Sequence, residues 1–171
     1  MYSRTKNEDA TETANLLTTI LVRYPEVSTI NYYPQKNTLR LNFIFTEELS
    51  EQQVNWITNF IQTGIEVFGI LEKNKTNIVK VNSEIIAGLT LIQLERDLPT
   101  LVQGEIGLII KGLRQSGLPN IIIDNPDDFY EDDLRFQEEM IESMLENVKT
   151  TTESKPLFAF REEGRVLVFN K

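Results

Sequence analysis

The chain has 171 residues, of which 40% are hydrophobic and 25% are charged, a composition typical of a folded globular protein rather than a disordered one. It contains no cysteine and no histidine, which excludes disulfides, thiolate catalysis, thiol-ligated metal sites and the nucleophile arrangements that need an imidazole base. The catalytic chemistry that remains available uses carboxylate, Lys, Tyr or Ser side chains, with or without a hard cation. The formal net charge is −9.

The first elements expected are a helix over residues 8–23 and a β-hairpin with strands at 27–33 and 38–46. Apolar residues recur at helical spacing in the first segment, and Tyr24-Pro25 ends it because a residue before proline disfavours the helical region. In the second strand Leu, Leu, Phe and Phe alternate with other residues at positions 39, 41, 43 and 45. This alternation predicts a half-buried strand.

A second helix is expected over residues 50–71. It opens on Ser50 with Gln53 three residues later, which is the capping-box pattern. Its apolar face is broad, with Trp56 at the margin of that face. The residues assigned to the face are Val54, Ile57, Phe60, Ile61, Ile65 and Phe68.

Two more strands, at about 77–82 and 85–95, and a third helix over 99–116 follow. The segment 85–95 is apolar on both faces and indicates a central strand. The third helix contains Gly104, Gly107 and Gly112. Because glycine destabilises a helix, we expect a neighbouring backbone to come close there.

The last elements expected are a short strand at 121–123, an amphipathic helix from about 128 to 148, and a hairpin with strands at 157–161 and 165–169. The fold class predicted is α+β, an antiparallel sheet with helices packed mainly on one face, plus the C-terminal helix and hairpin. We expect one domain over residues 1–171, within which 118–171 could be an appended unit.

The order of elements over residues 8–116 resembles that of type III secretion chaperones and their relatives. The segments that carry the likeness are TLRLNFIF, SEQQVNWITNFIQ and IIAGLTLIQLE. The resemblance implies a small acidic homodimer that binds polypeptide partners, and it assigns a role to no residue. Residues 118–171 depart from the layout by adding a helix and a hairpin.

The negative charge is concentrated in residues 124–153, where 11 acidic residues stand against two basic ones. One side of the helix at 128–148 carries the candidate partner-binding residues Glu138, Glu139, Glu142 and Glu146. A concentrated field of this kind attracts a basic partner, whereas the alternative is a solvated face above a packed one.

A candidate Mg²⁺ or Ca²⁺ site consists of Asp124, Asp127 and Asp128, because hard cations prefer carboxylate oxygens. The spacing does not match the calcium-loop pattern. Turn formation and helix capping account for the same residues, and no cofactor is predicted.

The function expected is a non-enzymatic protein-interaction or chaperone-like module that forms a homodimer, because the third helix and the terminal hairpin carry more apolar surface than a small monomer hides. One alternative is a small hydrolase or transferase that uses carboxylates with Mg²⁺, and another is a protein that binds an apolar small ligand. The acidic balance argues against nucleic acid as a partner. Because residues 1–17 lack the apolar core of a signal peptide and no segment is long enough to span a membrane, we expect a cytoplasmic protein without membrane contact.

Overall fold

The computed structural model describes residues 2–73, 75, 78–116, 131–150 and 155–170, and these form an α+β fold. The helices in these residues are α1 (Tyr2–Arg23), α2 (Glu51–Leu71), α3 (Gln103–Gln115), α4 (Glu131–Val148) and a short 3-10 helix, η1 (Leu98–Thr100). The strands are β1 (Thr29–Tyr33), β2 (Thr38–Phe45), β3 (Val79–Ile86), β4 (Leu89–Asp97), β5 (Leu157–Glu162) and β6 (Arg165–Asn170). The strands form one antiparallel sheet in the order β3-β4-β2-β1-β5-β6.

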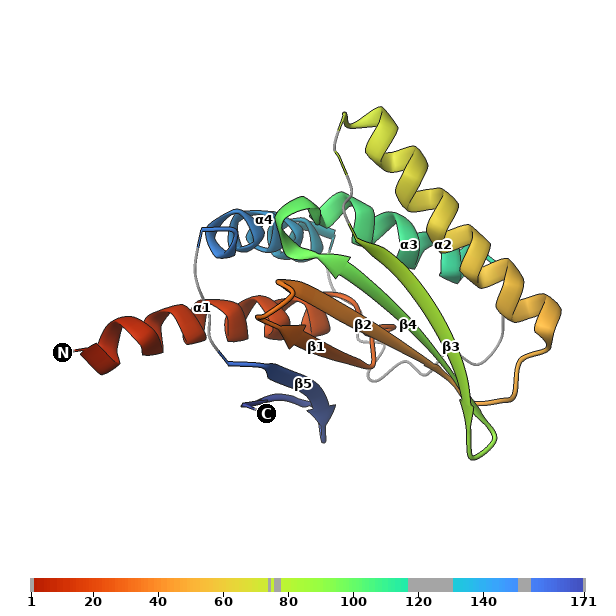
Figure 1. The fold of residues 1–171 in the computed structure, drawn as a ribbon, viewed down its shortest axis with the longest axis horizontal. Coiled ribbons are helices and arrows are strands. Elements are labelled where there is room, and N and C mark those ends of the chain that lie inside the picture. Colours follow the sequence, from red (N-terminus) through yellow and green to blue (C-terminus); the bar gives the residue numbers. More distant parts are fainter. Residues whose placement is uncertain (1, 74, 76–77, 117–130, 151–154, 171) are drawn as a thin grey trace.

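The two faces of the sheet differ because successive side chains along a strand point in opposite directions. In β2 the residues predicted to share the inner face, Leu39, Leu41, Phe43 and Phe45, are all buried. All four α-helices add side chains to the core cluster that contains these residues. The predicted arrangement, an antiparallel sheet with helices mainly on one face, is confirmed (Figure 1).

The C-terminal elements share that core. Strand β5 pairs with β1, so the terminal hairpin adds two strands to the edge of the same sheet. The Arg161 guanidinium donates to the carbonyl oxygens of Leu21 at 2.5 Å and Tyr24 at 3.0 Å. Helix α4 packs against α1, and its buried residues Ile141, Leu145 and Val148 belong to the core cluster. The helix and hairpin therefore cover apolar surface of the residues that precede them.

Several boundaries differ from the sequence-based expectation, among them the start of α1 at Tyr2 instead of residue 8. The β3–β4 turn falls at Ala87-Gly88, both at positive φ, so Ile85 and Ile86 belong to β3 and not to the central strand β4. Glycine tolerates positive φ without a steric penalty, which is why a two-residue turn forms there. The helix expected over 99–116 is divided: η1 ends at Thr100, Leu101 and Val102 are extended, and α3 begins at Gln103. The strand expected at 121–123 and the start of the fourth helix at 128–130 lie outside the described residues.

Figure 1 shows α2, α3 and α4 side by side, with α2 next to the edge strand β3 and the β3–β4 hairpin projecting beyond the helices. None of the helices in the described part of the chain combines the length and the hydrophobicity needed to cross a bilayer.

Candidate functional site

Three of the acidic side chains of α4 have partners in their own chain. Glu138 accepts a hydrogen bond from the Arg23 guanidinium of α1 at 2.5 Å, and Glu146 pairs with Lys149 at 2.8 Å. Glu142 accepts from the backbone N–H of Gln103 at 3.3 Å, at the first residue of α3. Of the predicted docking residues, Glu139, Glu142 and Glu146 are exposed and Glu138 is half-buried. Helix α4 thus directs two of its carboxylates, Glu138 toward α1 and Glu142 toward the start of α3, where a carboxylate is favoured by the positive end of the helix.

The candidate cation residues Asp124, Asp127 and Asp128 lie outside the described residues. Within the described ranges, no group of three or more Asp or Glu side chains is placed to hold a metal ion.

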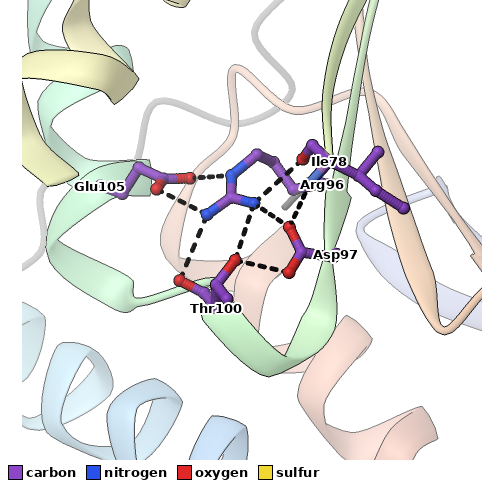
Figure 2. A network of polar contacts seen from close by, with 5 residues as sticks. All are labelled: Ile78, Arg96, Asp97, Thr100 and Glu105. Atoms are coloured by element: carbon purple, nitrogen blue, oxygen red, sulfur yellow. Dashed lines mark hydrogen bonds and ion pairs between the residues drawn. The ribbon is translucent and has the colours of Figure 1, made fainter. Parts of the chain in front are cut away.

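A second polar site lies where β4 meets α3, and its centre is the fully buried Arg96 (Figure 2). Its guanidinium is held by Glu105 through two hydrogen bonds, Nε to Oε2 at 2.7 Å and Nη2 to Oε1 at 2.9 Å. It also donates to Asp97 at 2.5 Å, to the Ile78 carbonyl at 3.0 Å, and to Thr100 at its side-chain and backbone oxygens. All three nitrogens of the guanidinium therefore have acceptors.

The carboxylates of this network have opposite pKa shifts. Burial raises the pKa of Glu105, and the bonds and charge of Arg96 offset this only in part. Burial also acts to raise the pKa of Asp97, but hydrogen bonds from Thr100 and the Ile78 backbone, with the Arg96 charge, leave it below its usual range. We conclude that the network is structural, and that it fixes α3 to the sheet.

Two of the three glycines of α3, Gly104 and Gly112, receive aromatic rings from α2, whereas Gly107 lies beside Gln103 and Tyr24. A Cβ added at Gly112 would overlap the Phe60 ring, and one added at Gly104 would come within 2.9 Å of the Phe68 ring. The expectation of a close approach is confirmed at Gly104 and Gly112. The approaching group is an aromatic side chain, however, and not the neighbouring backbone that the sequence led us to expect.

Above this contact the two helices leave an open apolar groove. It has a volume of about 480 Å³ and is lined by Trp56, Asn59, Phe60, Thr63, Gly64, Val67 and Leu108. None of these side chains can ionise. The exposed fractions of Trp56, Val67 and Leu108 are 45%, 47% and 41%. The groove is thus an apolar, uncharged surface open to solvent, between α2 and the wall that α3 provides.

The groove belongs to a longer pattern on α2, which we call the outer stripe and define as Trp56, Phe60, Thr63, Val67 and Ile70. These positions are spaced 4, 3, 4 and 3 residues apart, and Ile70 is 76% exposed. The inner stripe, Ile57, Ile61 and Ile65, is fully buried. At 3.6 residues per turn, the two stripes together span roughly 200° of the helix surface, about twice what a helix with one buried face needs.

The outer stripe was not recognised as a site from the sequence. Phe60 was counted in the core face, and Trp56 was placed at its margin. The signal available was the 4-3-4-3 spacing running beside the inner stripe, which is the spacing of a helix-packing seam.

No protein-family model, curated protein or solved structure matches this chain. The resemblance to type III secretion chaperones stays a prediction.

Proposed function

We propose that this protein is a non-enzymatic protein-interaction module that docks an apolar helix of a polypeptide along the outer stripe of α2. The observation that carries the proposal is the uncharged groove between α2 and α3, whose lining side chains Trp56, Val67 and Leu108 are close to half exposed. A large exposed apolar patch on a small protein is a usual mark of an interaction surface. Trp56 stacks on Phe60 with ring centroids 5.3 Å apart, and a partly rigid aromatic pair of this kind is a common anchor in interfaces.

A helix suits this surface better than an extended peptide. The 4-3-4-3 spacing of the outer stripe matches the a and d positions of a helix seam, in which side chains of one helix enter spaces on the other. From Trp56 to Ile70 the stripe is roughly 21 Å long at 1.5 Å per residue, which corresponds to about four turns of a partner helix. Recognition by a helix in an apolar groove would follow from these dimensions.

The alternative ligands fit less well. The groove volume lies within the range of small-molecule sites, but such sites enclose most of their ligand, and this groove leaves its own lining half exposed. Carboxylate chemistry with Mg²⁺ has no support in the groove, because no Asp or Glu lines it. A basic partner on α4 would compete with Arg23 for Glu138 and with the start of α3 for Glu142.

Photo-crosslinking in the native cell tests this proposal. A benzophenone amino acid at Val67 in the full chain should form an adduct with a polypeptide, identified by mass spectrometry as an apolar helical segment. The matched control places the same amino acid at Phe136 of α4, which is 62% exposed but lies outside the groove. Replacing Leu108 with Glu should lower the adduct yield at Val67 by roughly tenfold, since a charge would be desolvated in the groove. Equal adducts at both positions, no peptide adduct at Val67, or indifference to Leu108→Glu would each contradict the proposal.

A further inference from the structure

The groove beside the outer stripe contains a glycine, Gly64, whose lack of a side chain no described neighbour requires. A Cβ added at Gly64 would meet no described atom within 4 Å, whereas Gly104 and Gly112 each make room for an aromatic ring. Glycine within a helix costs about 1 kcal/mol relative to alanine. Gly64 follows Thr63, the middle residue of the outer stripe, and lies about 100° around the helix from it, so two small residues lie together beside the centre of the stripe. A helix from another chain could approach most closely at this point.

The sizes along the outer stripe are arranged around that centre. Trp56 lies seven residues before Thr63, and Ile70 lies seven residues after it. If two copies of α2 crossed antiparallel about Thr63, Trp56 of one copy would lie opposite Ile70 of the other, and Phe60 would lie near Val67. Each large aromatic residue would then face a smaller aliphatic one, as in an isologous interface in which the same surface is used by both copies.

The charges on α2 also favour a second copy. None of the five residues of the outer stripe is charged, in a chain that is 25% charged and carries a net charge of −9. A residue at a two-fold axis meets its own copy, so a charged residue there would meet a like charge. Thr63, the residue placed at the axis, has instead a hydroxyl, which can donate to and accept from its own copy.

We infer that the helix docked on the outer stripe is α2 of a second copy of this chain, crossing antiparallel about Thr63 and Gly64. The inference rests on the proposed function of the groove. It differs from the homodimer expected from the sequence, which would have used the third helix and the terminal hairpin. In the structure Ile106, Ile109, Ile110 and Leu113 of α3 are buried within the chain, and the hairpin pairs with β1.

A charge-swap experiment on the full chain tests this geometry. Thr63 is exposed, so Thr63→Glu and Thr63→Lys should both fold, as circular dichroism would verify. In sedimentation velocity, each variant alone should have a dimer dissociation constant raised by roughly two orders of magnitude, because like charges meet at the axis. An equal mixture of the two variants should recover the dimer, since Glu then faces Lys. Asn55→Glu adds the same charge to α2 away from the outer stripe and should leave the dissociation constant within roughly threefold of the parent.

Fluorescence gives a second readout that needs no variant, because Trp56 is the only tryptophan in the chain. Quenching by acrylamide should increase on dilution through the dissociation constant, as Trp56 becomes exposed. A parent that stays monomeric at about 200 µM, variants that dimerise like the parent, a mixture that stays monomeric, or quenching that does not change on dilution would each overturn the inference. A monomeric parent that still crosslinks from Val67 to another polypeptide would leave the proposed function standing, whereas loss of all peptide adducts would remove both.

Discussion

Helices α2 and α4 lie on either side of α3 and meet solvent in opposite ways. Helix α4 is the more charged, yet Glu138 and Glu142 contact α1 and the start of α3. Helix α2 is the less charged, yet it leaves Trp56, Val67 and Ile70 between 45% and 76% exposed. A charged helix can satisfy its side chains within its own chain, whereas an apolar stripe without a cover has no such partner. This difference is the reason that we propose the apolar surface of α2, and not the acidic helix α4, for interaction.

The largest effect is expected from removing the anchor of α3, the helix that α2 and α4 both contact. Arg96→Ala should lower the free energy of unfolding by about 3–5 kcal/mol, because it leaves the carboxylates of Glu105 and Asp97 buried without their cation. Urea denaturation measures this. Arg40→Ala is the matched control, because Arg40 lies on the other face of the sheet at 3.6 Å from Glu95 and its side chain is 29% exposed. Equal losses for the two variants would show that the Arg96 network does not anchor α3.

The two stripes of α2 can be compared directly. Ile61→Ala on the inner stripe should cost about 2–4 kcal/mol in the free energy of unfolding, because it opens a cavity in the core. Val67→Ala on the outer stripe should change it by no more than about 0.5 kcal/mol in the monomer. Denaturation at low protein concentration separates the stability of the monomer from that of any dimer. A large loss for Val67→Ala in the monomer would mean that the outer stripe belongs to the core.

The glycines provide the next comparison. Gly112→Ala should destabilise the fold by about 1–3 kcal/mol, because its Cβ would overlap the Phe60 ring. Gly64→Ala should instead stabilise the monomer by up to about 1 kcal/mol, since alanine favours the helix and the position is open. Thermal unfolding of both variants checks the signs. The same sign for both would contradict the packing described for α2 on α3.

The smallest effect is expected on α4. Glu138→Gln should cost up to about 1 kcal/mol, because it weakens the pair with Arg23, whose side chain is 12% exposed. Glu139→Gln removes the same charge one residue further on, at an exposed position, and should cost less than about 0.5 kcal/mol. The difference should shrink at high salt, which denaturation in 1 M sodium chloride would test. If Glu139 proved to be the more costly of the two, the contact of α4 with α1 would need to be reassigned.

Local patterns in the sequence were enough to predict the class of fold and much of its detail. The Ser50–Gln53 capping box forms with both of its hydrogen bonds, at 3.2 Å and 2.9 Å. The alternation in β2 places Leu39 and Phe43 in the core as expected. These features depend on residues a few positions apart, whose interactions are set by the helical and strand periods. The turn at Ala87-Gly88 was missed because the apolar run on either side of it conceals the break between two strands.

The sequence by itself determined that the chain is an α+β protein with an apolar α2 and an acidic α4. Only the tertiary structure decided which part of each helix meets solvent. The inner and outer stripes of α2 are both uncharged and mainly apolar in sequence, and they differ in burial because α2 packs on α3, where Gly104 and Gly112 admit Phe68 and Phe60. Glu138 looks solvated on a helical projection, and it contacts Arg23 because α1, 115 residues earlier in the chain, packs there. Periodicity is local, whereas burial depends on elements that are distant in sequence.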